Sequence, residues 1–238
     1  MMLLQQGGAV PQSVLELVRT SSIETKVVLV VIALFSLASW FVIGLKWWQF
    51  RRLNRQAERF FAEMERSTRL EEAYQHVMRQ PGSPYTRLFS EAIQFYNELR
   101  PGGMKAGPDA RHDVLTLTQL EALKMVLGKE VSSERDMLGH YITWLATIGS
   151  VGVLLGLLGT VLGVMDAFIG IATRGSGNIG AVAPGVAEAL VTTVAGLATS
   201  IPAIIGYNYF VNKVRLFTGE LEGFANELIG TMAREGLL

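Results

Sequence analysis

Several residue types are missing or scarce in this 238-residue chain, and their absence excludes classes of function. There is no cysteine, which removes disulfides, thiolate metal sites and cysteine nucleophiles. The three histidines, His76, His112 and His140, are scattered and match no metal-ligand spacing, so we expect them on helix surfaces and expect no metal site. Charged residues make up only 18% of the chain and the net charge is zero, so no overall field favours nucleic acid. No strand pattern is evident either.

Long apolar runs are what the sequence has instead, and three of them predict membrane-spanning helices. The first run covers residues 27–45 and contains no charge. As a helix it would measure about 28 Å, which is enough to cross the hydrocarbon core of a bilayer. The second run covers residues 141–172 and the third covers residues 182–211. We therefore expect an all-α integral membrane protein with three transmembrane helices.

Basic residues flank these spans unevenly and predict their orientation. They cluster after the first and third spans, at Lys46, Arg51, Arg52, Arg55, Lys213 and Arg215, whereas the opposite side carries only Arg19, Lys26 and Arg174. Segments rich in Lys and Arg stay in the cytoplasm. We therefore expect an N-out, C-in topology: a periplasmic segment 1–26, a cytoplasmic helical domain 46–140, a short periplasmic loop 173–181 and a cytoplasmic C-terminal helix 212–238.

The cytoplasmic part has a helical composition throughout. Residues 49–80 are rich in good helix formers and end at a Pro-Gly-Ser-Pro breaker, and residues 85–99 predict a second, short helix. Asp109 is the expected N-cap of a third helix. No strong breaker follows it until residue 173, so this helix is expected to run from about residue 110 through the second span.

Small residues recur along the second span at steps of three and four. They place on one helix face Gly149, Gly152, Gly156, Gly159 and Gly163, followed by Ala167 and Gly170. Small residues let membrane helices approach closely. The stripe is expected to pack either within one chain or against a neighbouring subunit, and it indicates tight assembly rather than chemistry.

Polar residues inside the second and third spans predict an ion pathway. The two spans are antiparallel and joined by a short loop, so residues equally far from that loop lie at similar depth. This pairs Thr160 with Thr193 near the middle of the membrane and Asp166 with Glu188 nearer the outside. Intramembrane carboxylates attract cations or exchange protons, and hydroxyls can hold a file of water.

Each of these residues also has an alternative interpretation. A threonine in a membrane helix often bonds the carbonyl four residues earlier, and Asp166 can meet water or pair with Arg174. Glu188 has no basic residue close in sequence, so we expect it to face a water-filled pathway or a partner. Thr192 shares a helix face with Glu188, whereas Thr193 lies about 140° away on a straight helix, which leaves open whether the helix is distorted or the two line different sides.

Three segments in these spans resemble a known family. They read LATIG (145–149), GLLGTVLGVMDAF (156–168) and APGVAEALVTTVAGLATSIPAIIGYN (183–208). The sequence resembles the TolQ/ExbB branch of the MotA/TolQ/ExbB proton-channel family, with a first span, ending FSLASW (35–40), that is more similar to TolQ than to ExbB. The order of spans and the large cytoplasmic insert match as well.

The resemblance implies a complex in the bacterial inner membrane that needs no cofactor. Several copies, usually five, would form a ring around the membrane helices of a dimeric partner resembling TolR or ExbD, whose aspartates carry protons. The inflow would drive motion that is passed to a periplasm-spanning protein resembling TolA or TonB. The family's two pore threonines fall on Thr160 and Thr193, and its acidic residue of the third span falls on Glu188.

The expected function is therefore a stator-like proton-channel subunit that couples the proton-motive force to work at the cell envelope. The alternative is a structural membrane scaffold without ion flux, which explains the glycine stripe but not Glu188 and the aligned threonines. A solute transporter is disfavoured because the chain has three spans and no internal repeat. An enzyme is not expected, because the cytoplasmic helices show no nucleophile–base or metal constellation.

Overall fold

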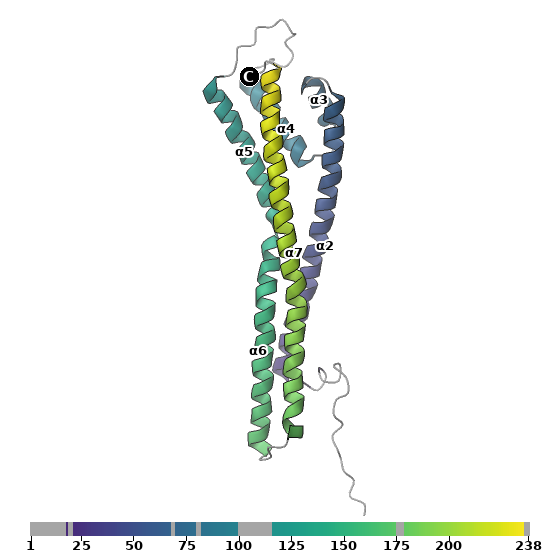
Figure 1. Cartoon of the computed structure of the whole chain (residues 1–238), viewed down its shortest axis with the longest axis vertical. Coiled ribbons are helices and arrows are strands. Elements are labelled where there is room, and N and C mark those ends of the chain that lie inside the picture. The colour runs from purple at the N-terminus through teal and green to yellow at the C-terminus, as the bar shows by residue number, and fades with distance from the viewer. Residues whose placement is uncertain are drawn as a thin grey trace, which may run out of the picture. The chain divides into compact units, whose positions relative to one another are not determined.

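The computed structural model describes residue 18 and residues 21–67, 70–79, 82–99, 116–174 and 179–235. Within these residues every regular element is a helix: α2 (Ile23–Arg66), α3 (Leu70–Val77), α4 (Pro84–Leu99), α5 (Leu117–Gly139), α6 (Ile142–Arg174) and α7 (Ile179–Arg234) (Figure 1). Three helical stretches are long and apolar enough to cross a membrane, namely α2, α5 with α6, and α7. The predicted all-α fold with three spans is confirmed.

Some predicted features lie outside the described residues. They include most of the N-terminal segment 1–26, the Asp109 N-cap and residues 175–178 of the expected loop 173–181, whose other residues belong to the ends of α6 and α7.

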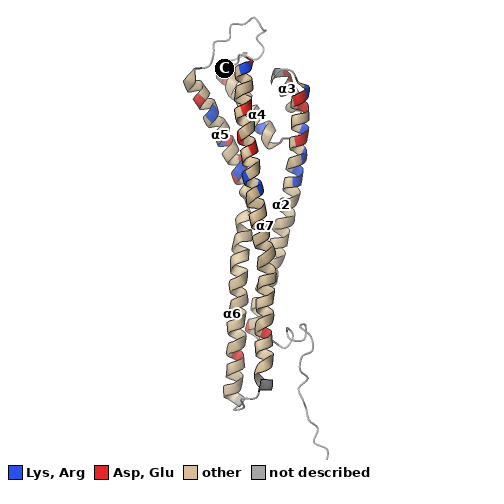
Figure 2. Ribbon diagram, in the orientation of Figure 1, with Lys and Arg blue, Asp and Glu red and all other residues tan. Residues whose placement is uncertain are grey.

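The chain divides into two compact units, which we describe separately. The apolar unit comprises residues 1–44 and 141–208, and the polar unit comprises residues 45–140 and 209–238. Lys, Arg, Asp and Glu are spread along α3, α4 and α5 of the polar unit, whereas α6 of the apolar unit carries almost none (Figure 2). Helices α2 and α7 each contribute one part to each unit.

Helix α2 begins at a capped N-terminus and is longer than the apolar run that it contains. The hydroxyl of Ser22 accepts a hydrogen bond from the backbone N–H of Thr25 at 3.3 Å, as an N-cap side chain does. The helix then runs without interruption to Arg66, because the residues after the apolar run are also good helix formers. The predicted helix over residues 49–80 is therefore divided between the end of α2 and the separate helix α3.

The expected single helix from about residue 110 through the second span is interrupted at Tyr141. This residue has a φ of 67°, which a bulky side chain rarely adopts and which breaks the helical hydrogen-bond ladder. Helix α5 therefore ends at Gly139, and α6 begins at Ile142. Helix α5 also begins later than expected, where Thr116 and Gln119 form a capping box. No glycine or proline marks Tyr141 itself, so the composition gave no signal for this break.

Helix α7 is continuous over 56 residues, although Pro184 and Pro202 lie inside it. Each proline removes one backbone hydrogen bond but does not end the helix. The third span and the C-terminal helix, which we expected as separate segments, are thus parts of one element.

Aromatic rings form the centre of the polar unit. Phe60 of α2 is completely buried, with its ring centroid 5.6 Å from Tyr85, 6.2 Å from Phe89 and 5.3 Å from Phe224. These rings come from α2, α4 and α7, and the contact with Phe224 is edge-on at 88°. Aromatic pairs favour such edge-to-face geometry. The rings therefore hold three helices of the polar unit together.

Buried charges in the polar unit connect elements that are distant in sequence. Lys46 is 1% exposed, and its ammonium donates to the backbone carbonyl of Leu138 at 2.9 Å. That carbonyl belongs to the last turn of α5, where a cation is favoured by the helix dipole. Arg87 of α4 forms an ion pair with Glu134 of α5, which is 2% exposed. Burial raises the pKa of the neighbouring Glu130, and the charges of Glu134 and Glu91 raise it further.

Candidate ion pathway between helices α6 and α7

Helices α6 and α7 pack backbone against backbone along the glycine stripe. A Cβ added to Gly196 of α7 would lie 2.6 Å from the carbonyl oxygen of Gly152 and 2.9 Å from the Cα of Gly156. A Cβ added to Gly163 would lie 3.0 Å from the carbonyl oxygen of Gly185. Such distances are too short for any side chain, so only glycine permits this approach. Figure 1 shows the two helices running side by side.

All five glycines that the stripe predicts face α7 of the same chain. Besides Gly152, Gly156 and Gly163, a Cβ on Gly149 would lie 2.5 Å from a side-chain carbon of Ile204, and one on Gly159 would overlap the side chain of Thr192. Of the two alternatives for the stripe, the structure shows packing within one chain. Gly170, near the end of the stripe, has no atom of the described residues within 4 Å of an added Cβ.

A pair of hydroxyls interrupts this close contact. The structure brings together Thr160 of α6 and Thr193 of α7, whose Oγ1 atoms form a hydrogen bond with each other. Both hydroxyls also lie within hydrogen-bond distance of the carbonyl oxygen of Gly156, at 3.0 Å and 3.2 Å respectively. The Thr193 hydroxyl also lies 3.5 Å from the carbonyl oxygen of Ala189, so two donors and four acceptor oxygens converge at this point of the helix pair.

The hydroxyl pair has two equivalent hydrogen-bond arrangements. Each hydroxyl has one proton to donate. When Thr160 donates to Gly156, Thr193 donates to Thr160; when Thr193 donates to Gly156, Thr160 donates to Thr193. Both arrangements use the same heavy-atom positions. Either one leaves an acceptor lone pair available to a further donor, such as water or a protonated carboxyl group.

Thr160 borders a groove on the surface of α6. The groove is shallow and apolar, and its other lining residues are Leu157, Val161, Val164, Met165 and Phe168. Both threonines are half-buried rather than enclosed. The groove thus has Thr160 among its lining residues, while the Thr160 hydroxyl bonds Gly156 and Thr193.

The predicted site residue Thr192 is placed differently from its neighbour. It is completely buried, and its hydroxyl donates to the carbonyl of Ala189 at 2.7 Å within the same helix. This is the usual structural role of a membrane threonine. Thr192 therefore packs against Gly159 rather than facing an open path.

Farther along α7, Ser200 is 1% exposed, and its hydroxyl has no hydrogen-bond partner among the described residues.

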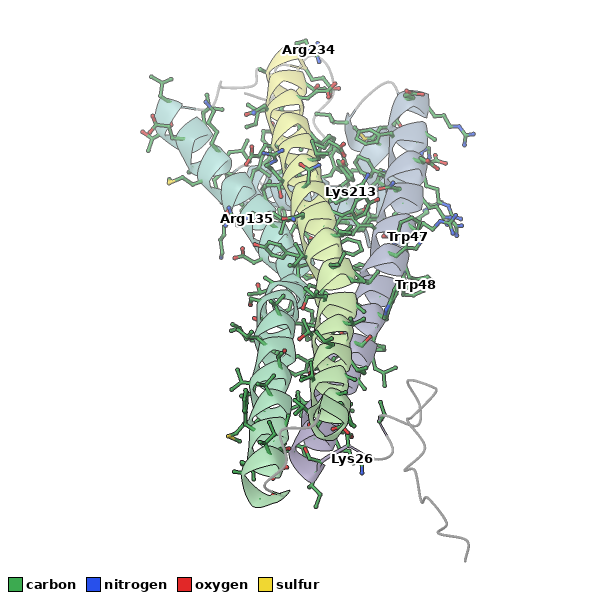
Figure 3. All side chains as sticks on the ribbon, turned by 60° about the horizontal axis from the view of Figure 1, so that its bottom comes forward. Lys26, Trp47, Trp48, Arg135, Lys213 and Arg234 are labelled. Atoms are coloured by element: carbon green, nitrogen blue, oxygen red, sulfur yellow. The ribbon has the colours of Figure 1, made fainter. Side chains whose placement is uncertain are left out.

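Glu188 of α7 lies beside the N-terminus of α2. The sequence did not indicate this neighbour. The Glu188 carboxylate interacts electrostatically with the backbone N–H of Ser22 and with the ammonium of Lys26. Lys26 is labelled in Figure 3. Because Ser22 is the N-cap of α2, Glu188 places a carboxylate from another helix beside the first turn of α2. A negative charge is also favoured at this end of a helix dipole.

Asp166 is half-buried and interacts electrostatically with Glu188. The two carboxylates, one from α6 and one from α7, therefore repel each other. The alternative partner Arg174 has a side chain outside the described residues.

The structure also separates Glu188 from Thr193 around α7. Thr193 bonds to Thr160 on α6, whereas Glu188 interacts electrostatically with Ser22 at the start of α2. The two residues therefore face different neighbours, and no distortion of α7 is needed to account for both. Ser22 and Lys26 were not among the predicted site residues, because their proximity to Glu188 depends on how α2 packs against α7.

Comparison with known proteins agrees with the resemblance. Residues 95–223 match the model of the MotA/TolQ/ExbB proton channel family. The chain is 30% identical to the Tol-Pal system protein TolQ of Pseudomonas aeruginosa over 229 residues, which cover 94% of each chain. It is 31% identical to the biopolymer transport protein ExbB of Xanthomonas campestris pv. campestris, over 85% of this chain and 79% of that one.

A second ExbB, from Pseudomonas putida, is 28% identical over 91% of this chain and 62% of its own length. The matched region contains α6 and most of α7, and therefore both threonines of the hydroxyl pair. The family is one of channels rather than of enzymes. This chain belongs to the MotA/TolQ/ExbB proton channel family.

Proposed function

We propose that this protein is the channel-forming subunit of a Tol- or Ton-type energy-transducing complex of the inner membrane, in which protons pass along the face of α6 and α7 that carries Thr160 and Thr193. The family supports an energy-transducing membrane subunit in general terms. The passage of protons at these residues, and their coupling to work at the cell envelope, are the proposal.

The hydroxyl pair is the observation that carries this proposal. Two threonines from different helices bond each other at the edge of an apolar groove, in spans whose only charges within residues 141–172 and 182–208 are Asp166 and Glu188. A polar group in such surroundings is costly unless it is used. The two hydrogen-bond arrangements allow the pair to accept a proton on one side and release one on the other without moving the backbone.

The groove beside Thr160 also fits the expected partner. We propose that it receives the membrane helix of a protein resembling TolR or ExbD, which would bring a carboxyl group to the hydroxyl pair. Several copies of this chain, usually five in the family, would surround two such helices. The complex would act on a periplasm-spanning protein resembling TolA or TonB, with the N-terminus of this chain outside and its C-terminus inside.

The scaffold alternative has one observation in its favour. Glu188 places its charge at the N-terminus of α2, which is a structural role that needs no ion flux. If Glu188 handles protons, replacing it with a neutral isostere should stop the proton flux. If Glu188 only stabilises the N-terminus of α2, the replacement should leave the flux unchanged. Glutamine keeps an acceptor oxygen for Ser22 but cannot be ionised.

The test measures proton uptake into liposomes that contain the full-length chain with its co-expressed partner. Thr160→Val removes the hydroxyl and keeps the shape, and we expect it to lower the proton flux by about tenfold or more, which corresponds to the loss of a stabilisation of about 1.4 kcal/mol. Thr147→Val is the matched control, because the Thr147 hydroxyl on the same helix is exposed and bonds only the carbonyl of Thr143.

Glu188→Gln separates the two roles of Glu188. Loss of flux with normal insertion and assembly supports proton handling, whereas normal flux assigns Glu188 a structural role at the N-terminus of α2. Unchanged flux in both Thr160→Val and Glu188→Gln would contradict the proposed pathway along these residues, and absence of flux in the unmodified complex would support the scaffold.

A further inference from the structure

We infer that the polar unit contains a binding site for the headgroup of an anionic phospholipid, between α2 and α7. The site is a small pocket lined by Trp47, Phe50, Arg51, Asn54, Tyr209, Phe210 and Lys213. Figure 3 labels Trp47 and Lys213, which lie on the two helices. This inference does not depend on proton flux or on the hydroxyl pair.

Stacked aromatic rings form the walls of this pocket. The rings of Trp47 and Tyr209 are stacked, with centroids 6.3 Å apart and planes inclined by 24°. Behind them, Phe50 and Phe210 stack at 6.0 Å, and both are buried. Trp47 and Tyr209 remain 54% and 45% exposed, so the pocket has a rigid base and an open, amphipathic rim. Exposed tryptophan and tyrosine are typical of the level at which lipid headgroups lie.

The charge of the pocket is positive and uncompensated. Arg51 and Lys213 line it from opposite helices, and neither lies within ion-pair distance of a carboxylate in the described part of the chain. The ammonium of Lys213 lies 5.9 Å from the ring centroid of Tyr209, and this contact holds it at the rim. The first acidic residues that follow in sequence are Glu58 on α2 and Glu220 on α7.

The position of the pocket along α2 and α7 favours a lipid phosphate over a soluble phosphate as the ligand. Trp47 follows the first apolar run, which ends at Leu45, by two residues, and Tyr209 lies within the end of the third run. Both helices therefore meet the pocket where their apolar stretches end. A phosphate attached to acyl chains would satisfy both the basic side chains and the apolar rim. Basic pockets between membrane helices on the cytoplasmic side bind such headgroups.

The experiment uses the full-length chain, purified in detergent and titrated with palmitoyl-oleoyl phosphatidylglycerol, with bound lipid counted by native mass spectrometry. Each basic residue near an anionic headgroup contributes about a fivefold change in affinity, so we expect the double variant Arg51→Gln/Lys213→Gln to bind about 30-fold more weakly. Arg59→Gln/Arg215→Gln is the matched control. It removes the same charge from exposed positions of the same two helices outside the pocket, and we expect less than about a twofold change.

Two further arms make the result decisive. The double variant Arg51→Lys/Lys213→Arg keeps both charges, and we expect it to retain binding. Phosphatidylcholine is expected not to compete, and neither is an excess of glycerol 3-phosphate. Equal weakening in both glutamine double variants would overturn the inference, because it would show a diffuse charge effect. Displacement of the lipid by glycerol 3-phosphate would also overturn it, since a soluble phosphate would then be the ligand.

Discussion

The two units of this chain are held together in opposite ways. In the apolar unit, α6 and α7 meet where side chains are absent, and a single added Cβ at Gly196 would lie 2.6 Å from a backbone oxygen. In the polar unit, α2, α4 and α7 meet through large rings around the fully buried Phe60. Helix α7 takes part in both units, so one part of it packs through glycines and another part packs through aromatic rings.

The solvent of each unit explains the difference. In water, burying a large ring is strongly favourable, so the polar unit gains most from aromatic side chains. In lipid, apolar side chains gain nothing by leaving the solvent, and helices associate through close van der Waals contact and hydrogen bonds. The glycine contact and the Thr160–Thr193 bond are the two kinds of interaction that remain.

The largest effect is expected in the polar unit. Phe60→Ala leaves a cavity among Tyr85, Phe89 and Phe224 and should destabilise the polar unit by about 3–5 kcal/mol. Limited proteolysis and the denaturant midpoint of the detergent-solubilised chain measure this loss. Phe61→Ala, at a position that is 39% exposed, should cost clearly less. Similar losses in both variants would show that the rings do not form a specific core.

A smaller effect is expected at the glycine contact between α6 and α7 of the apolar unit. Gly196→Ala inserts a methyl group between two backbones and should destabilise the α6–α7 contact by about 1–3 kcal/mol, because the helices must move apart. Unfolding in a denaturing detergent, followed by circular dichroism, measures this change.

Gly170→Ala is the control on α6 for the glycine prediction, because its added Cβ meets no atom within 4 Å in the described part of the chain. We expect a change within about 0.5 kcal/mol. Equal stability of Gly196→Ala and Gly170→Ala would contradict the backbone-to-backbone packing of the apolar unit.

The smallest effect concerns charge in the polar unit. Burial and neighbouring carboxylates raise the pKa of Glu130 in the folded protein, so its ionised form destabilises the fold and stability increases as the pH falls toward that pKa. Glu130→Gln should therefore stabilise the protein at neutral pH by about 0.5 kcal/mol. The gain should shrink in mildly acidic solution, where the wild-type carboxyl group becomes neutral.

Thermal unfolding at several pH values measures the Glu130 effect. Glu121→Gln, on the exposed surface of the same helix, should change stability less. A gain that is constant with pH would show that the Glu130 carboxyl group is not responsible.

Much of the fold and part of the candidate site were predictable from the sequence. The three spans follow from apolar runs whose length fits a bilayer, and the small-residue face of α6 follows from helical spacing alone. The proximity of Thr160 and Thr193 follows from the short connection between two antiparallel helices. The role of these threonines in conduction stays a prediction.

Other features depended on contacts that no local pattern encodes. Nothing near Glu188 in sequence indicated Ser22 and Lys26, because they lie on a different helix. The break at Tyr141 is not marked by any glycine or proline at that position, so local propensity alone predicted one continuous helix.

The sequence by itself thus determined which segments enter the membrane, which face of α6 is small, and which hydroxyls share a depth. These properties depend on composition and periodicity along single helices. Only the tertiary structure decided that the glycines pack within one chain, that Glu188 lies beside the N-terminus of α2, and that the aromatic residues of α2, α4 and α7 form one core. The physical reason is that these contacts join residues far apart in the chain, and helix packing alone selects which of the many possible partners meet.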